Sequence, residues 1–190
     1  MGTGWKLYRR ALPLAALFFG FTAGSWGQLN STAGSVALTA TLGESITLAV
    51  TPGTMSFALV AGGTATGSTP ISITTTWVLA ASRSNLVLDA YFSSASAALS
   101  TAGPPVVNIP SSEVLGQMTT GTPTSYTPFT QTGVVGAAGA GLALFTVSLS
   151  SSNRAGTRTD SFSLEIDIAS QPQLPAAVYT GTVYIQAQAL

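Results

Sequence analysis

The chain has 190 residues, of which 46% are hydrophobic and 6% are charged, and it contains no cysteine and no histidine. The shortage of Lys and Arg excludes the basic surface on which nucleic-acid binding depends, and the hydrophobic content excludes a disordered chain. Because no disulfide can form, the hydrophobic core alone must stabilise the fold.

The first 27 residues have the features of a secretory signal peptide. Lys6, Arg9 and Arg10 form a basic start, Ala11 to Phe21 is apolar, and small residues follow it up to Gly27. A helix of this apolar stretch reaches about 16 Å, which is too short for the roughly 30 Å of a bilayer core. We therefore expect cleavage after Gly27 and export through the periplasm to the cell surface or the medium. An uncleaved membrane anchor is the alternative.

The rest of the chain, residues 28–190, is acidic and carries few charges. Three arginines stand against six acidic residues, which gives a net charge of −3. We expect such a chain to bind neither nucleic acid nor an anionic membrane, and not to insert into a membrane after cleavage. Its charged residues are Arg83, Arg154, Arg158, Glu44, Asp89, Glu113, Asp160, Glu165 and Asp167.

Between residues 36 and 92, apolar and polar side chains alternate in five runs, as expected for strands with one buried face. The first two runs form either one kinked strand or two strands. In the fourth run the alternation places Trp77 on the inner face, and the polar residues 82–85 that follow predict a hairpin to the fifth run. The five runs are 36–42, 46–50, 55–59, 71–79 and 86–92.

The alternation weakens in the middle of the chain, from residue 93 to residue 141. Five prolines interrupt this stretch, so that only short strands are expected, at 106–109 and 114–118. The glycine-rich residues 133–141 predict a loop.

Toward the C-terminus the alternation is strong again. The run 142–149 changes phase after Leu144, which predicts a β-bulge, and a polar turn is expected at 151–159. The last two strands are predicted at 162–168 and 183–189.

These strands and the turns between them predict an all-β fold. No segment of the exported chain has a convincing helical periodicity. We expect a single domain over residues 28–190, built as an antiparallel β-sandwich of about seven to nine strands. A closed barrel is the alternative architecture.

The exported chain lacks the residues that catalysis most often uses. It has no His, Cys or Lys to act as a base or a nucleophile, so we expect no enzymatic activity and no cofactor. Glu165 and Asp167 are expected on the solvent face of one strand rather than at a glycosidase site. With Asp160 they offer calcium ligands, but without the spacing of a calcium-binding loop. Three aromatic residues are expected to pack in the core or an interface, with stacking on sugars as the alternative: Tyr126, Phe129 and Tyr184.

The two ends of the exported chain carry distinctive patterns. At the first end, the alternating run Ser35–Val50 breaks at Gly43-Glu44 and leads to Met55-Ser56-Phe57. At the other end, Leu174–Leu190 contains a proline turn, a Tyr-Thr pair and a closing strand. Together they resemble the spore-coat-U-type and related pilin-like domains of chaperone–usher systems. The resemblance implies an immunoglobulin-like sandwich that lacks its last strand, which the N-terminal strand of the next subunit supplies.

The resemblance also implies roles for individual residues. Residues 28–42 would be the donated strand, and the C-terminal strand would be the acceptor edge. The implied partners are further copies or related surface subunits, and a periplasmic chaperone. The implied anchors are Val36, Leu38, Ala40 and Leu42 on the donor, and Val183, Ile185, Ala187 and Ala189 on the acceptor.

This chain departs from the pilin-like pattern in two ways. The cysteine pair of many such domains is missing, and the donor-like run lies close to the first core strand, so an ordinary intramolecular strand is the alternative. We expect a secreted structural subunit of a cell-surface appendage or envelope layer that is not an enzyme. The alternative function is a carbohydrate-binding or adhesive module that acts alone.

Overall fold

The computed structural model describes residues 31–190, and the signal peptide expected at residues 1–27 lies outside the described residues. Strands dominate this part of the chain, with one short helical turn, η1 (Ser111–Glu113). Among the described residues there is no helix with the length and apolar character needed to cross a membrane. The strands are β1 (Ser45–Thr51), β2 (Thr64–Thr66), β3 (Ile71–Val78), β4 (Asn85–Tyr91), β5 (Leu99–Thr101), β6 (Asn108–Ile109), β7 (Val114–Met118), β8 (Thr127–Pro128), β9 (Gly141–Ser148), β10 (Ala155–Asp167), β11 (Tyr179–Gly181) and β12 (Tyr184–Ala189).

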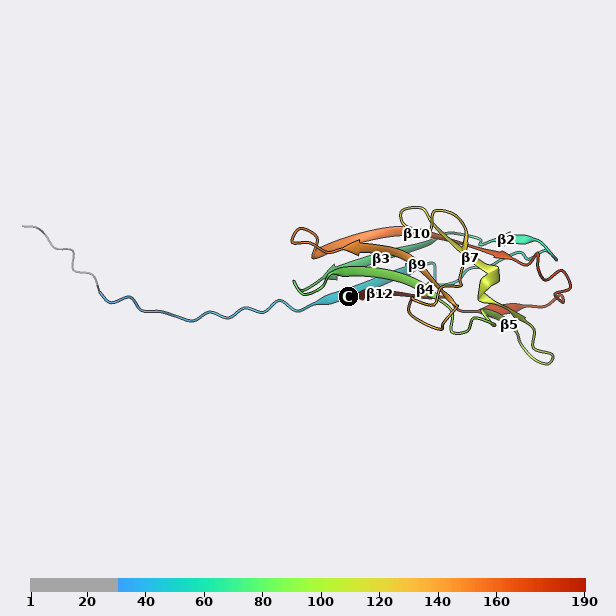
Figure 1. Ribbon diagram of the computed structural model, residues 1–190, viewed down its shortest axis with the longest axis horizontal. Coiled ribbons are helices and arrows are strands. Elements are labelled where there is room, and N and C mark those ends of the chain that lie inside the picture. The colour runs from blue at the N-terminus through green and yellow to red at the C-terminus, as the bar shows by residue number, and fades with distance from the viewer. Residues whose placement is uncertain (1–30) are drawn as a thin grey trace, which may run out of the picture. The chain divides into compact units, whose positions relative to one another are not determined.

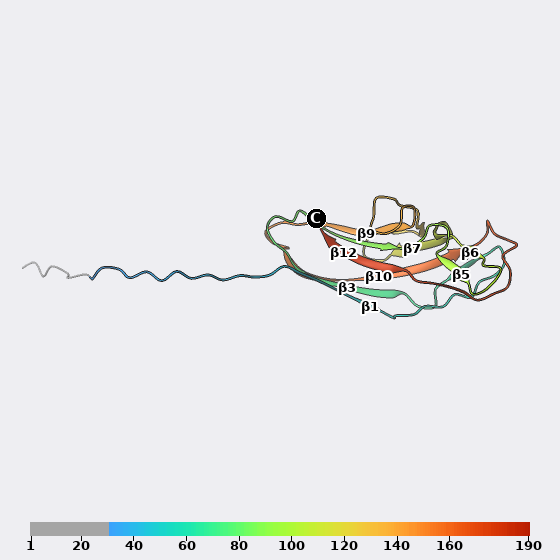
Figure 2. The same cartoon turned by 90° about the horizontal axis from the view of Figure 1, so that it is seen from below.

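The strands pair in three antiparallel sheets. The largest has the order β1-β3-β10-β7-β8, with β2 paired to β10, and the others have the orders β12-β4-β9 and β11-β5-β6. Figure 2 shows β1, β3 and β10 side by side in one layer, with β9 and β12 in the layer that faces it, and in Figure 1 the two layers overlap. The predicted all-β antiparallel sandwich is confirmed. Seven strands have five or more residues, and five shorter strands add to them.

The hydrophobic core fills the space between the two layers. Ile73 and Phe162 contribute from the largest sheet, and Leu88 and Leu142 contribute from the facing sheet, each with no exposed surface. Phe129 lies in the loop after β8 and is also fully buried. Each such side chain contributes about 1.5–3 kcal/mol relative to an exposed position, so this core can stabilise the fold without disulfides.

The alternation seen in the sequence matches burial in the long strands. In β3 the side chains are alternately buried and exposed, and Trp77 is 6% exposed on the inner face as predicted. Its indole N–H donates a hydrogen bond of 2.9 Å to the carbonyl of Asn153, which satisfies the buried polar atom. The second half of β10 follows the same alternation, with Leu164 and Ile166 buried.

The predicted bulge is present in β9. Leu88 of β4 pairs with Phe145, and the next residue, Asp89, pairs with Ala143. Leu144 is therefore the extra residue, and both Leu144 and Phe145 are buried. A bulge allows two successive side chains to face the core, which explains the change of phase in the sequence.

The predicted hairpin at residues 82–85 is wrong, because this segment crosses between sheets. β3 pairs within the largest sheet, whereas β4 pairs with β12 and β9 in the facing sheet. The crossover is fixed by Arg154, whose guanidinium donates hydrogen bonds to the carbonyls of Ala80 and Arg83. A hairpin within one sheet and a crossover between two sheets both place the connection at the protein surface. The polar composition of residues 82–85 is therefore compatible with either.

Three other segments differ from the strand predictions. The run 36–42 forms no strand, and the first strand, β1, begins at Ser45. Residues 55–59 are extended with alternating exposure, but they belong to no strand. The turn expected at 151–159 ends earlier, because β10 already begins at Ala155. Thr157 and Thr159 are polar because they lie on the outer face of β10, where they pair with β3.

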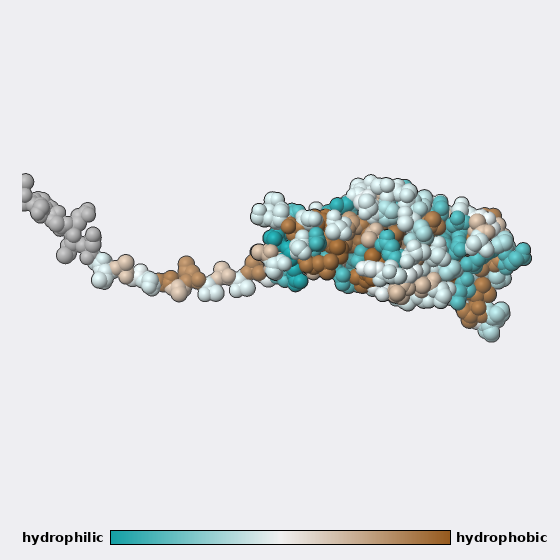
Figure 3. Space-filling model, viewed as in Figure 1, coloured by the Kyte–Doolittle hydropathy of each residue, from teal (hydrophilic) through white to brown (hydrophobic). Residues whose placement is uncertain are grey.

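The outer face of the largest sheet carries hydroxyl side chains in place of charges. Thr74 and Thr76 of β3 lie 3.0 Å, oxygen to oxygen, from Thr159 and Thr157 of β10. Such cross-strand threonine pairs stabilise a sheet by roughly 0.2–1 kcal/mol each. Figure 3 shows a visible face made mostly of residues with intermediate hydropathy, with hydrophilic and hydrophobic patches between them.

Candidate functional site

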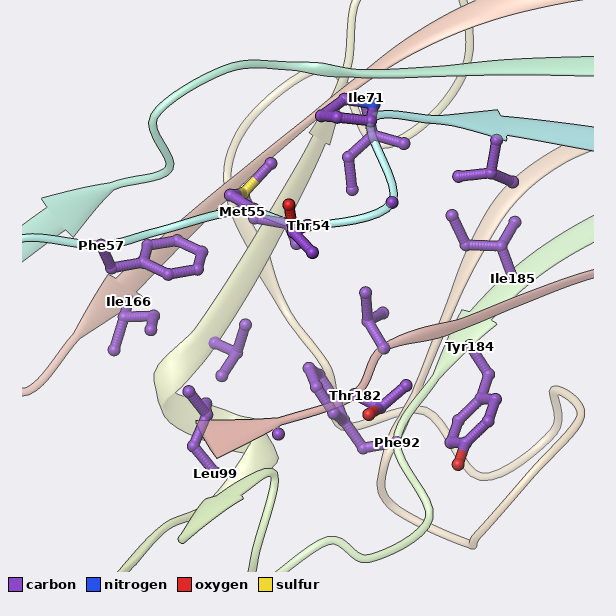
Figure 4. A pocket seen from close by; sticks show the side chains of 17 residues that line it. Thr54, Met55, Phe57, Ile71, Phe92, Leu99, Ile166, Thr182, Tyr184 and Ile185 are labelled. Atoms are coloured by element: carbon purple, nitrogen blue, oxygen red, sulfur yellow. The ribbon is translucent and has the colours of Figure 1, made fainter. Parts of the chain in front are cut away.

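An apolar groove opens between the edges of the two layers. It has a volume of about 570 Å³ and lies between residues 50–57 on one side and residues 181–185 on the other. Its lining includes buried core residues, among them Ile71, Phe92 and Ile166. Figure 4 shows these side chains around an open space. The groove is therefore open to solvent beside these core side chains, which are themselves at most 5% exposed.

The first wall of the groove is the extended segment that follows β1. Met55 and Phe57 are half-buried, with exposed residues between them, and both point into the groove (Figure 4). The backbone of this segment makes few hydrogen bonds: the Ser68 N–H donates to the carbonyl of Ser56 at 2.9 Å, and the Ser56 N–H donates to the Ser68 hydroxyl at 3.4 Å. The segment thus has the shape of a strand without a neighbouring strand.

The second wall is the segment that leads into β12. Val183 and Ile185 line the groove together with Tyr184. β12 is the end strand of its sheet and pairs only with β4 among the described strands. An end strand presents unpaired N–H and C=O groups along its free side, and these groups can accept another strand.

The hydrogen-bond pattern shows which peptide groups point to the free side. Leu190 and Asn85 exchange two backbone hydrogen bonds, of 2.9 and 3.1 Å. In an antiparallel pair the bonded residues alternate, so the even-numbered residues of β12 bond to β4. The peptide groups of Val183, Ile185 and Ala187 consequently point toward the groove side.

One end of this free side is closed by an ion pair, named here the Glu44–Arg83 clasp. The guanidinium of Arg83 donates two hydrogen bonds, of 3.2 and 3.1 Å, to the Glu44 carboxylate, just before β1. Arg83 also donates to the carbonyl of Ala189 at 3.4 Å, and the Ala80 N–H donates to Glu44 at 2.8 Å. These bonds, first that from Arg83 and then that from Ala80, lower the pKa of Glu44 below its usual value. The clasp therefore links the start of β1 to the end of β12.

The acceptor residues predicted from the sequence lie in two different environments. Val183 and Ile185 line the groove. Ala187 and Ala189 are half-buried nearer the clasp, where Ala189 and Ile46 line a second, smaller hollow. The open part of the acceptor edge is therefore shorter than the predicted one.

The predicted donor residues lie in a segment without secondary structure. Residues 31–44 form no strand, and the exposed fractions of Val36, Leu38 and Leu42 are 84%, 91% and 85%. Ala40 is exposed as well. Soluble proteins rarely expose a regular series of large apolar side chains without a use for it.

The acidic residues considered as catalytic or calcium-binding groups do not converge. Glu165 and Asp167 lie on the outer face of β10, whereas Asp160 points inward and pairs with Arg158 at 2.8 Å. Within residues 31–190, no three acidic side chains come close enough together to hold a metal ion.

The three aromatic candidates for sugar stacking also differ from one another. Phe129 is fully buried and packs edge-on against Phe92, so the expected packing in the core is confirmed for this residue. Tyr126 is half-buried. Tyr184 is 45% exposed and stacks on Tyr91 with ring centroids 5.4 Å apart.

Sequence reasoning missed the first wall and the clasp. The alternation at Met55 and Phe57 indicated burial of one face, but it contains no information on whether a strand lies alongside. Glu44 and Arg83 are 39 residues apart, and neither stands in a recognisable motif. The shortage of charges was the available signal, because a charged residue in such a chain is a candidate for a specific contact.

Comparisons with known proteins give no relative. No family model matches the chain, and no curated protein or solved structure matches it either.

Proposed function

We propose that this chain is an exported structural subunit of a cell-surface appendage or envelope layer, and that its copies join by β-strand donation. In this proposal the N-terminal segment 35–42 of one copy occupies the apolar groove of the next copy. The subunit has no enzymatic activity of its own.

The groove is the observation that carries the proposal. It is an open apolar space, floored by core side chains, between two walls that both lack a strand on the groove side. A strand placed there would cover the apolar floor and would bond to the free peptide groups of Val183, Ile185 and Ala187. No other kind of ligand satisfies a row of alternating backbone donors and acceptors as completely.

The proposed occupant of the groove is the exposed segment 35–42 of another copy. Its four apolar residues alternate with small or hydroxyl residues, so an extended conformation places all four on one face. Burial of Val36, Leu38 and Leu42 would contribute roughly 1.5–3 kcal/mol each before the cost of ordering the segment. The segment contains no charge that would have to be desolvated.

Deletion of residues 28–42 tests the proposal. We expect the truncated protein to keep its β-sheet circular dichroism and to elute as a monomer in size-exclusion chromatography, whereas the chain starting at Gln28 forms larger species. Unfolding of the truncated protein would show that the segment belongs to its own core. Assembly without the segment would reject strand donation.

A matched pair of variants separates the anchors from the segment as a whole. Leu38→Asp places a charge on the face that enters the groove, and we expect it to abolish assembly. Thr39→Asp places the same charge on the opposite face, and we expect assembly to persist. Equal effects of the two variants would contradict an inserted strand with one buried face.

A carbohydrate-binding or adhesive module is the second candidate function, and one observation favours it. The exposed ring of Tyr184 is held by stacking on Tyr91, beside the amide of Gln186, whose oxygen lies 3.4 Å from the Tyr91 hydroxyl. A fixed aromatic face next to an amide can hold a sugar ring. Loss of glycan binding in Tyr184→Ala, with the oligomeric state unchanged, would support this candidate.

A further inference from the structure

The Glu44–Arg83 clasp stands at one end of the free side of β12, and the groove lies at the other end. At the clasp end, Ile46 and Ala189 line one small hollow with Glu44 and Arg83, and the carbonyl of Ala189 is already bonded to Arg83. At the groove end, residues 181–185 face open space. A strand that enters the gap therefore has an open end and a blocked end.

The open end determines which way a donated segment must run. The C-terminal end of the segment is attached to a folded domain, which is too large to enter the groove. The leading end is then its N-terminal part, which advances toward the clasp. Because β12 itself runs toward the clasp, as the Arg83–Ala189 contact shows, the inserted segment lies antiparallel to β12.

We propose that the Glu44–Arg83 clasp is a stop that sets the register of the inserted segment. This inference rests on the function proposed above. With Ala189 occupied, Ala187 is the last residue of β12 whose peptide group is free to bond to the segment. The deepest register that the clasp allows places Val36 opposite Ala187 and Leu42 opposite Gly181. All four anchors then face the gap, and Glu44 of the donor stays outside, in its own clasp.

The absence of cysteine from the chain makes this register directly measurable. In the proposed register, Ala37 stands opposite Gln186, with both side chains on the outer face. These two residues would face each other without hydrogen bonds between their backbones. Antiparallel pairs of this non-hydrogen-bonded type have Cα atoms about 4.5 Å apart, which is within the range of a disulfide. A shift by two residues would bring Ala37 opposite Gln188 instead. Copies that carry Ala37→Cys are therefore mixed with copies that carry Gln186→Cys, Gln188→Cys or Thr182→Cys, and are oxidised.

With the clasp intact, we expect cross-linking to Gln186→Cys and several-fold less to Gln188→Cys. When Arg83→Gln is added to the acceptor copy, cross-linking to Gln188→Cys should rise to a level comparable with that to Gln186→Cys. Glu44→Gln, which opens the clasp from its other side, should have the same effect. Glu165→Gln, which removes a charge from the outer face of β10, away from β12, should leave the pattern unchanged.

Three results would overturn the proposal, and they are distinguishable. If the cross-linking pattern, with Gln186→Cys preferred, is the same in both clasp variants, the stop is rejected, but strand donation is still supported. Cross-linking to Thr182→Cys would show insertion in the opposite direction or in a register four residues shallower, and either contradicts the stop. Assembly without a cross-link to any of the three positions would reject insertion along β12, and with it the proposed function. Circular dichroism of each clasp variant shows whether a changed pattern reflects the register or a loss of the fold.

Discussion

Arg158 and Asp160 show how one of the few charged pairs serves the fold. The Asp160 side chain is fully buried, and its carboxylate accepts hydrogen bonds from the Arg158 guanidinium at 2.8 and 2.9 Å and from the Thr120 hydroxyl at 2.6 Å. The guanidinium also lies over the ring of Phe145, 4.5 Å from its centroid. A buried carboxylate needs all these partners, because water is not available to it.

We expect Arg158→Gln to destabilise the protein by about 3–5 kcal/mol, since it leaves a buried carboxylate without its counter-charge. Urea unfolding followed by tryptophan fluorescence measures this change. Arg83→Gln serves as the control, because its ion pair is exposed and such pairs contribute little to stability. Similar losses in the two variants would contradict the role of burial.

Asp89 is a buried carboxyl group without an arginine partner. It is 5% exposed on β4, and burial raises its pKa, which the hydrogen bond from the Val135 N–H offsets in part. Because the folded-state pKa is above the unfolded value, ionisation disfavours the folded state. This cost is absent below the unfolded pKa of about 3.9, grows as the pH rises, and is complete above the folded pKa.

We therefore expect Asp89→Asn to be more stable than the unmodified protein at pH 7, with the difference shrinking as the pH falls toward 4. Urea unfolding of both proteins across this pH range gives the difference directly. Glu44 has the opposite dependence, because its pKa is lowered and its contribution is lost as the pH falls through the folded value. Taking the difference between the two proteins removes the Glu44 contribution, which is common to both.

Among the elements, the segment after β1 forms one wall of the groove on which the proposed function depends. Residues 54–60 are extended, but they have almost no backbone partners among the described residues. Amide groups without stable hydrogen bonds exchange rapidly with solvent.

We expect the amides of residues 54–60 and of Val183, Ile185 and Ala187 to be protected from hydrogen–deuterium exchange in the assembled form relative to the truncated monomer. The amides of β3, which is paired on both sides, provide the control and should exchange equally slowly in both forms. Protection confined to β12 would mean that the inserted strand contacts only one wall.

Most elements could be predicted from the sequence because burial in this fold follows strand periodicity. Leu164 and Ile166 alternate with polar residues, and the change of phase at Leu144 identified a bulge. Local patterns report which side chains are buried. They do not report the partner strand, so the crossover at 82–85 was mistaken for a hairpin.

The candidate site shows the same limit. Val183 and Ile185 could be identified as inward-facing residues of an end strand. The groove beside them arises from a missing neighbour of Met55 and Phe57, and a missing strand leaves no local pattern. The Glu44–Arg83 clasp joins positions far apart in the sequence, which only the three-dimensional fold brings together.

At the scale of the whole molecule, filling the groove should stabilise the protein. A peptide of residues 35–42 binds the folded state of the truncated protein in this proposal, and ligand at 100 times its Kd adds about 2.7 kcal/mol of stability. We expect a corresponding rise in Tm that depends on peptide concentration. A peptide of the same composition, with apolar and polar positions exchanged, should have no effect. Equal effects of both peptides would indicate non-specific binding.

The engagement of all three arginines of residues 28–190 has a consequence for proteolysis. Arg83 and Arg158 are held in ion pairs, and Arg154 bonds to two backbone carbonyls. Residues 28–190 contain no lysine, so these three arginines are the only cleavage positions for trypsin-like proteases in this part of the sequence. The 55 residues from Gln28 to Ser82 contain no such position. A trypsin-like protease therefore cannot remove residues 35–42 alone, because cleavage after any of the three arginines leaves this segment attached to β1 and β3.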